Sequence, residues 1–349
     1  LVMSEWMPVM GCLPCGWRSG SRFRCPRCVP QPKARLRPVA LCDDAARGIL
    51  GFPMSTSRIS DAPAGSDLAP LVRTAAARLA AAGVPSADVD AELLAAHVLG
   101  LGRGELAAAM MRGDRMPELE ATRFAEFVER RAAREPLQHL TGRAPFRHME
   151  LRVGPGVFVP RPETEMVAQL AIDALREAPG PEPVAVDLGT GSGALALALA
   201  TEVPHARVHA AENSVEAFIW AKENFAEQAP HARLAFIDLA DAFPELDGTV
   251  SVVVSNPPYV PDDAVPRDPE VRFWDPPAAL YGGADGLDVV RVLSGVALRL
   301  LHPGGTLVIE HGEWQGPGIR EILTADGWRG AATHPDLTLR DRATTALRP

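Results

Sequence analysis

The sequence Asn256-Pro257-Pro258-Tyr259 brings together residue types that can hold a planar amino group. The side-chain oxygen of Asn256 and the backbone carbonyl of Pro257 can each accept one N–H bond. Proline fixes the backbone φ angle, so these acceptors are in place before a ligand binds. The ring of Tyr259 can stack on the π face of the bound group. The pattern therefore predicts a site for an NH₂ group on a planar carbon.

A glycine-rich segment, Asp187-Leu-Gly189-Thr190-Gly191-Ser192-Gly193, leads directly into an apolar stretch with helical character. Glycines let a backbone turn tightly and approach a ligand, and the first N–H groups of a helix are free to bind it. The spacing also fits the loose dinucleotide-binding pattern, with Glu212 at the place of a ribose-binding acid. The acid at Asp187 and the Gly-x-Gly-x-Gly run instead resemble class I methyltransferases, which favours S-adenosylmethionine as the ligand.

The two motifs together point to methyl transfer onto an amide nitrogen. An amide nitrogen is a weak nucleophile, because its lone pair is delocalised into the carbonyl group. Two acceptors that hold its hydrogens would favour a pyramidal nitrogen and aim the lone pair at the sulfonium methyl. The gain in rate would come from positioning and electrostatics. The proton can leave after the transfer, so a dedicated general base is optional.

Strands and helices alternate from about residue 163 onward, which predicts a parallel sheet with helices on both faces. The predicted strands are 184–188, 207–211, 234–237, 250–255 and 306–310, and the predicted helices are 164–177, 194–202, 214–227, 285–301 and 316–325. Residues 331–334 and 343–347 are expected to close the sheet as an antiparallel edge pair. Both motifs directly follow a predicted strand, so we expect them at the carboxyl ends of the strands, where open α/β sheets bind ligands.

Residues 67–134 show helical periodicity throughout, with apolar residues at i, i+3, i+4 and i+7 in the first helix. A second helix follows, and its predicted inward face consists of Val89, Leu93, Ala96 and Leu99. Shorter helices are predicted near 103–110 and 117–133. Glycines and prolines then punctuate residues 136–162, which predicts a hairpin and a linker. The helical region is either a structural cap or a surface that docks a partner.

All five cysteines occur in the first 42 residues. Four of them form a CxxC…CxxC pair, a spacing typical of zinc sites, and these are Cys12, Cys15, Cys25 and Cys28. The surrounding segment has neither helical nor strand periodicity, and Met54 begins a stretch that looks like an ordinary protein start. We interpret residues 1–53 as an unstructured extension or the product of a mis-set start, with a zinc knuckle as the alternative. No metal site is predicted elsewhere.

Charge divides the sequence unevenly, with a net charge of +5 in residues 1–53 and of −14 in the remainder. A body this acidic is a poor non-specific binder of nucleic acid, because neutralised phosphates supply most of that affinity. No apolar run approaches the roughly 18 residues that span a bilayer, and the first residues lack the pattern of a secretory signal. We therefore expect a cytoplasmic monomer that contacts neither nucleic acid nor membrane directly.

Over about residues 67–349 the sequence resembles the release-factor glutamine N5-methyltransferases. The likeness rests on Asp187-Leu-Gly-Thr-Gly-Ser-Gly, on Ser255-Asn-Pro-Pro-Tyr and on the linker Phe158-Val-Pro-Arg-Pro-Glu-Thr-Glu165. Residues 135–142 and 279–288 support it. The resemblance implies methyl transfer from S-adenosylmethionine to the glutamine of the Gly-Gly-Gln motif in class I release factors. The linker favours this group over the similar enzymes that act on a glutamine of a ribosomal protein.

The resemblance also implies roles for individual positions. Those implied to bind the cofactor are Gly189, Thr190, Gly191, Ser192, Gly193, Glu212, Asp238 and Asn256. Within this set, the glycine loop would wrap the methionine and ribose, Glu212 would hold both ribose hydroxyls, and Asp238 would contact the adenine with Leu239 beside it. Those implied to bind the glutamine amide are Asn256, Pro257, Pro258 and Tyr259, with Asn256, Pro257 and Tyr259 as the catalytic residues. Phe146 and residues 161–165 would line the peptide entrance.

We therefore predict a doubly wound, mostly parallel, seven-stranded Rossmann-like methyltransferase sheet with a small N-terminal helical bundle and a linking β-hairpin. The predicted parts are an extension at 1–65, a bundle at 66–138 that docks the substrate protein, a hairpin and linker at 139–162, and the S-adenosylmethionine-dependent domain at 163–349. Two positions depart from the family pattern. Glu212 stands where Asp is usual, and Arg147 stands where Trp is frequent.

Three alternatives to this function stay open. The first is a methyltransferase for a ribosomal-protein glutamine, and the second modifies an exocyclic amino group of a nucleic acid. The acidic body and the absence of a basic, aromatic-rich recognition region weigh against the second. The third is a non-catalytic cofactor-binding module that serves as a docking protein, which the intact Asn-Pro-Pro-Tyr segment disfavours. The sequence assigns no role to Glu310, at the end of the last parallel strand.

Overall fold

The computed structural model describes residues 65–349. The predicted pair of CxxC motifs at Cys12, Cys15, Cys25 and Cys28 lies outside the described residues. So does nearly all of the predicted extension. The boundaries proposed for the parts of the chain stay predictions.

Four helices form the N-terminal bundle, namely α1 (Leu68–Ala81), α2 (Ala87–Leu99), α3 (Arg103–Arg112) and α4 (Glu118–Ala132). The short strands β1 (Ser66–Asp67) and β2 (Arg115–Met116) pair antiparallel at the start of the bundle. Apolar side chains from all four helices bury one another, among them Leu68, Leu79, Leu94, Leu106 and Phe124. A short helix, α5 (Leu137–Thr141), follows the bundle.

The predicted inward face of α2 was wrong in part. Val89 is 40% exposed, whereas Ala91, Leu94 and Ala95 are fully buried. The helix is rotated because Asp90 is also buried, where its carboxylate accepts a bond of 2.7 Å from the Arg131 guanidinium. Apolar periodicity alone could not predict this rotation, because the buried ion pair decides which side of the helix faces inward.

A hairpin connects the bundle to the sheet, as predicted. Strands β3 (Arg143–Phe146) and β4 (Met149–Arg152) pair antiparallel, with Phe146 opposite Met149. The two-residue turn places Arg147 at a φ of 52°. Its guanidinium is bound to the Glu202 carboxylate and, at 2.8 Å, to the Gln169 side chain. Arg147 is therefore committed to contacts within the chain.

The central sheet has seven strands in the order β10-β11-β9-β8-β5-β6-β7. Five are parallel, namely β5 (Val184–Leu188), β6 (Arg207–Glu212), β7 (Arg233–Phe236), β8 (Val250–Ser255) and β9 (Leu301–Glu310). The last two, β10 (Arg329–Pro335) and β11 (Asp341–Leu347), are antiparallel, and β11 lies between β10 and β9. This arrangement confirms the predicted mostly parallel, seven-stranded sheet.

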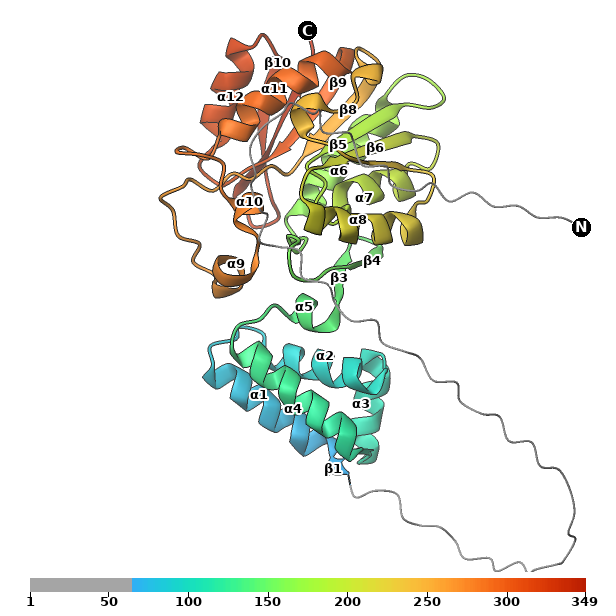
Figure 1. Cartoon of the computed structure of the whole chain (residues 1–349), viewed down its shortest axis with the longest axis vertical. Helices are drawn as coiled ribbons and strands as arrows, with labels where there is room; N and C mark the ends of the chain where they lie inside the picture. The colour runs from blue at the N-terminus through green and yellow to red at the C-terminus, as the bar shows by residue number, and fades with distance from the viewer. Residues whose placement is uncertain (1–64) are drawn as a thin grey trace, which may run out of the picture. The chain divides into compact units, whose positions relative to one another are not determined.

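Helices cover both faces of the sheet (Figure 1). One apolar layer joins the sheet to α6 (Thr164–Glu177), α7 (Ala194–Glu202) and α8 (Val215–Gln228). The other joins it to α11 (Asp288–Leu300) and α12 (Gly316–Ala325). Every residue of β5 and β8 is buried, as expected for central parallel strands that are covered on both sides.

The chain changes direction across the sheet between β5 and β8. It runs outward from β5 through β6 to β7, then returns to place β8 on the other side of β5. The loops that follow β5 and β8 therefore diverge at a topological switch point, where open α/β sheets bind ligands. Two short helices that the sequence did not predict, α9 (Pro269–Trp274) and α10 (Pro277–Leu280), lie in the long connection after β8.

Among the described residues, no single helix is long and apolar enough to span a bilayer. The bent pair of α2 and α3 meets the length and composition of a membrane span only when the two helices are taken together.

Candidate functional site

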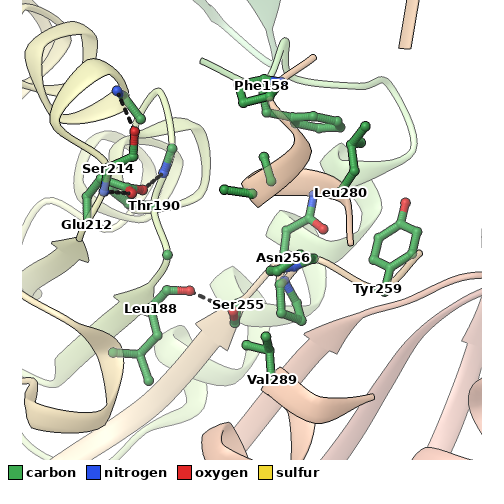
Figure 2. A pocket seen from close by; sticks show the side chains of 18 of the residues that line it. Phe158, Leu188, Thr190, Glu212, Ser214, Ser255, Asn256, Tyr259, Leu280 and Val289 are labelled. Atoms are coloured by element: carbon green, nitrogen blue, oxygen red, sulfur yellow. Dashed lines mark hydrogen bonds between the residues drawn. The ribbon is translucent and has the colours of Figure 1, made fainter. Parts of the chain in front are cut away.

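A cavity of about 920 Å³ lies at the carboxyl ends of β5 and β8 (Figure 2). Its lining brings together both sequence motifs with two acids, Glu212 at the end of β6 and Asp238 after β7. The predicted site residues in this lining are Gly189, Thr190, Gly191, Ser192, Glu212, Asp238, Asn256, Pro257, Pro258 and Tyr259. Of the predicted set, Gly193 alone is not part of the lining. A Cβ atom at Gly193 would collide with the ring of Phe225 and press on Leu197, so this glycine serves packing of the helix start.

The glycine loop is bonded to its surroundings before any ligand arrives. The N–H groups of Gly189 and Thr190 both donate to the Ala211 carbonyl at the end of β6, at 3.0 Å each. The Ser192 carbonyl accepts a bond of 2.8 Å from the side chain of Asn224, which is 1% exposed. These contacts fix the loop between two strands and α8.

Asp187 anchors the glycine loop from below. One of its carboxylate oxygens accepts bonds from the Thr190 hydroxyl at 2.6 Å and from the Ala196 N–H at 3.1 Å. The other oxygen has no partner among residues 65–349. Burial raises the pKa of Asp187 to about 7, against the effect of these two hydrogen bonds. The acid therefore holds the loop to α7 and does not face the cavity.

Glu212 faces the cavity, but its carboxylate is already largely engaged. One oxygen accepts from the Gly191 N–H at 2.7 Å, and the other accepts from the N–H groups of Asn213 and Ser214 at 3.0 and 2.8 Å. A carboxylate offers about four acceptor positions. In this arrangement about one position is open to a ribose hydroxyl, so binding of both hydroxyls would require one of these three bonds to break.

Asp238 begins the short 3₁₀ turn Leu239–Asp241 and lines the cavity beside Leu239. One carboxylate oxygen accepts from the Ala240 N–H at 2.9 Å, and the other accepts from the Asn213 side chain at 2.8 Å. Asn213 thus links the loops after β6 and β7. The exposed side of the carboxylate remains available to a donor in the cavity.

The Asn256–Tyr259 loop is fixed by contacts that the sequence did not predict. The Ser255 hydroxyl donates to the Leu188 carbonyl at 2.6 Å and so joins the ends of β8 and β5. The Gln315 side chain donates to the Tyr259 carbonyl at 2.8 Å and accepts from the Gly312 N–H at 2.9 Å. This bridge ties the loop to the segment after β9.

Two glycines after α10 pack directly against the same loop. A Cβ atom at Gly282 would collide with the Pro258 carbonyl, and one at Gly286 would collide with the Tyr259 carbonyl. The Gly-Gly-Ala-Asp-Gly run that begins at Gly282 was part of the family resemblance, and this close backbone approach is its physical reason. Sequence reasoning had no signal for Gln315, because its partner lies 56 residues away.

Tyr259 presents a neutral phenol. Burial, together with the nearby Glu310 carboxylate, raises the pKa of Tyr259 above its ordinary value. The hydroxyl therefore stays protonated at neutral pH and cannot act as a base there. Figure 2 shows its side chain with that of Asn256 at the edge of the cavity.

The residues expected at the peptide entrance divide into two groups. Phe146 is 1% exposed and packs in the apolar layer with Leu151 and Ile172, so the expectation that it lines the entrance was wrong. Successive side chains of β3 point to opposite faces, so Phe146 points to the core because Pro145 is exposed. Arg161 and Glu163 do line the cavity.

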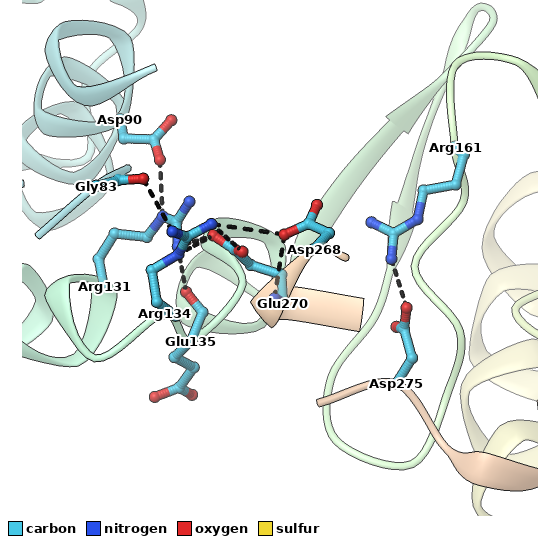
Figure 3. A network of polar contacts seen from close by, with 9 residues as sticks. All are labelled: Gly83, Asp90, Arg131, Arg134, Glu135, Arg161, Asp268, Glu270 and Asp275. Carbon is cyan, nitrogen blue, oxygen red and sulfur yellow. Dashed lines mark hydrogen bonds and ion pairs between the residues drawn. The ribbon is translucent and has the colours of Figure 1, made fainter. Parts of the chain in front are cut away.

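The connection that carries α9 contributes Asp268 and Val271 to the cavity and is held by arginines (Figure 3). The Arg134 guanidinium bonds the Glu270 carboxylate, which Arg131 also approaches at 2.7 Å. Although burial alone would raise it, these bonds lower the pKa of Glu270 to about 2. This connection is therefore fastened to the end of α4.

Comparisons with known proteins show which family the chain resembles. The family model described as PrmC N-terminal domain matches residues 70–142, and the model described as methyltransferase small domain matches residues 148–273. A release factor glutamine methyltransferase of Streptomyces coelicolor is 52% identical over 278 residues, which are 79% of this chain and 96% of that protein.

A second relative is named for a different activity. The 4-amino-L-phenylalanine/4-methylamino-L-phenylalanine methyltransferase of Streptomyces pristinaespiralis is 40% identical over 287 residues, which are 80% of this chain and 95% of that protein. Among solved structures, a 16S rRNA N2 G1207 methyltransferase of T. thermophilus in complex with AdoMet and guanosine has a TM-score of 0.43 and 23% identity, over 59% of this chain and 50% of that chain. From the two family models in chain order and the extent of the Streptomyces coelicolor match, the chain belongs to the release factor glutamine methyltransferase family.

Proposed function

We propose that the chain transfers the methyl group of S-adenosylmethionine to the side-chain amide nitrogen, N5, of the glutamine in the Gly-Gly-Gln motif of class I release factors. The observation that carries this proposal is the placement of Asn256 and Pro257 on a rigid loop that lines the same cavity as the glycine loop. A glutamine amide has two N–H donors, which match the two acceptor oxygens. Membership of the release factor glutamine methyltransferase family favours the glutamine of a release factor as the source of this amide.

The cavity suits a positively charged nucleoside ligand such as S-adenosylmethionine. Carboxylates outnumber cations in its lining, where Glu163, Glu212, Asp238, Asp268 and Asp288 face a single arginine, Arg161. The sulfonium and amino groups of the cofactor are cationic, so this field favours them. The N–H groups at the start of α7, other than that of Ala196, favour its carboxylate.

Individual residues then take the following parts. Glu212 accepts a ribose hydroxyl through its remaining acceptor position, and the glycine loop supports the methionine and ribose. Asp238 accepts from the adenine amino group, while Leu239 packs beside the ring. Asn256 follows β8 between the two halves of the cavity, where it touches both the cofactor and the amide.

The bound cofactor supplies an electrophilic methyl group on a positively charged sulfur. The Asn256 side-chain oxygen and the Pro257 carbonyl accept the two N–H bonds of the glutamine and aim its lone pair at that methyl. Because the nitrogen is a weak nucleophile, this alignment contributes most of the rate gain. Tyr259 stacks on the amide plane as a neutral phenol, and the amide proton leaves to water after transfer.

The rest of the chain serves recognition of the release factor. The bundle at 66–138 docks the substrate protein, residues 139–162 form the hairpin and linker, and residues 163–349 carry out the transfer. In this proposal the protein works as a monomer in the cytoplasm, beside its substrate. It contacts neither nucleic acid nor membrane directly.

A comparison of substrates tests the proposal. The full chain is incubated with labelled S-adenosylmethionine and, separately, with a class I release factor, a ribosomal-protein substrate, a DNA duplex and free 4-amino-phenylalanine. We expect kcat/KM to favour the release factor by at least about 100-fold. A release factor with Glu in place of the Gly-Gly-Gln glutamine is the matched control, and it should accept no methyl group because it lacks both N–H donors. Preference for another substrate would contradict the proposal.

A further inference from the structure

Glu310, the last residue of β9, is the most unusual buried acid of the described chain. Its side chain is 0% exposed, and neither carboxylate oxygen has a hydrogen-bond partner among residues 65–349. Burial of a carboxylate without partners is costly, so such a group calls for an explanation. Sequence reasoning gave Glu310 no role.

The sheet places Glu310 beside Asn256. Strands β8 and β9 are parallel, with Ser255 opposite Ile309. Continuing this register by one residue sets Asn256 next to Glu310, and side chains at paired positions of neighbouring strands point to the same face. Thr164, at the start of α6, is 3% exposed, and its hydroxyl likewise has no partner among the described residues.

The surroundings of the Glu310 carboxylate come from three further elements. Burial raises the pKa of Glu310 to about 7. The Thr164 hydroxyl and the Asn256 side chain lie close to the carboxylate, although neither completes a hydrogen bond to it, and together with the Arg342 guanidinium on β11 they oppose that rise. Glu163, before α6, adds to the rise. Tyr259 faces the same carboxylate and is neutral. The carboxylate is therefore ionised above about pH 7 and becomes protonated as the pH falls through that value.

We propose that Glu310 is a positioning residue that orients the Asn256 amide, an inference that rests on the proposed function. The substrate amide needs the oxygen of Asn256, so the NH₂ group of Asn256 must point away from it. The Glu310 carboxylate is the free acceptor on that side. In the flipped orientation the Asn256 oxygen would face a negative carboxylate, which repels it, so the charge selects the productive orientation before the substrate binds.

The test compares three variants of the full chain with the wild type. Glu310→Leu removes the acceptor, and Glu310→Gln keeps an acceptor oxygen but removes the charge. Ile309→Val is the matched structural control, because Ile309 is equally buried on the same strand and belongs to the apolar layer on one face of the sheet. Four quantities are measured: kcat and KM for the release factor, the dependence of kcat on pH, the Kd for S-adenosylmethionine and the midpoint of thermal unfolding.

We expect kcat to fall about 30- to 100-fold in Glu310→Leu and about 3- to 10-fold in Glu310→Gln, because a misaimed acceptor loses alignment of the amide. The Kd for the cofactor and the KM should change by less than about threefold. Wild-type kcat should decrease as the pH falls through about 7, and Glu310→Gln should lose this step. Ile309→Val should lower only the unfolding midpoint.

Three outcomes separate the possibilities. A wild type that methylates no release factor would defeat the proposed function itself. With an active wild type, a Glu310→Leu variant whose kcat per folded molecule stays within about twofold would show a purely structural role and overturn the inference. A Glu310→Gln variant that keeps the wild-type pH profile would overturn it as well, even if Glu310→Leu does not fold.

Discussion

On the side of the cavity formed by the loops after β5, β6 and β7, the acidic side chains that face inward already have partners. Glu212 accepts three backbone N–H bonds, and Asp238 accepts one backbone and one side-chain bond. Beside the loop after β8, Glu310 at the end of β9 and Thr164 at the start of α6 have none among the described residues. The acids that face the proposed cofactor half are therefore already bonded, although one oxygen of Asp187 beneath the glycine loop is not, and the proposed amide half retains two polar side chains without partners.

This difference matches what each half has to recognise. A cofactor is bound by shape, backbone N–H groups and charge. A loop whose own hydrogen bonds are already formed provides all three. An amide has to be aimed, and aiming requires acceptor oxygens that are fixed but still free. The two halves should therefore fail separately, the first in cofactor affinity and the second in the rate of methyl transfer.

The largest effect on rate is expected for Asn256→Ala. Loss of one of the two acceptors should reduce kcat by about 10³-fold, as for the loss of a positioned hydrogen-bonding group at a reacting centre. The Kd for S-adenosylmethionine, measured by calorimetry, should stay within about threefold. Asn213→Ala is the matched control, because Asn213 lines the other half of the cavity. An Asn256→Ala variant with normal kcat would remove the proposed mechanism.

Asp187 should make folding stability depend on pH. Because burial raises its pKa to about 7, the folded protein retains a proton at pH values where the unfolded chain has lost it. The free energy of unfolding should therefore decrease as the pH rises from about 4 to about 7, by up to about 4 kcal/mol for a shift of this size. Denaturant titrations should show a smaller decrease in Asp187→Asn. Part of the decrease should remain, since Glu310 titrates in the same window. An unchanged slope would mean that Asp187 is ionised in the folded state.

Glu212→Ala should act on the cofactor half alone. Loss of a charged acceptor for the ribose should raise the Kd for S-adenosylmethionine about 10- to 100-fold. At saturating cofactor, kcat should change by less than about threefold. Glu212→Asp restores the acid usual in the family and should stay within a few-fold of the wild type. A lower kcat at saturating cofactor without a change in the Kd would contradict the separation of the two halves.

Gln315→Ala should have a smaller effect, confined to the amide half. It removes the bond that holds the Tyr259 carbonyl, and the loosened loop should lower kcat about 10-fold. Gln169→Ala, which removes a half-buried glutamine bound to Arg147, is the control and should leave kcat unchanged. Equal effects of the two substitutions would indicate general destabilisation.

Much of the fold could be predicted because the central strands are continuous apolar runs. The bounds of β5, β8, α6, α7 and α12 agree with the sequence analysis. Strand β9 begins at Leu301, five residues before the predicted start. The prediction began too late because Pro303, Gly304 and Gly305 have the composition of a turn. Helices α9 and α10 were missed, since prolines at their starts suggested a loop.

The candidate site could be predicted where a motif is contiguous, as for Asn256–Tyr259 and the glycine loop. The bond from Gln315 to Tyr259 and the adjacency of Glu310 and Asn256 arise only when β8 and β9 pair, so local sequence carried no signal for them. Arg147 was noted as a departure, but its partner Glu202 lies 55 residues away.

The most direct test of the central claim locates the transferred methyl group. The full chain is incubated with S-adenosylmethionine and a purified class I release factor, and the peptide that contains Gly-Gly-Gln is fragmented in a mass spectrometer. We predict one added methyl group on the side-chain nitrogen of that glutamine, formed about 10³-fold more slowly by Asn256→Ala. A methyl group on any other atom, or none despite measured cofactor binding, would contradict the account.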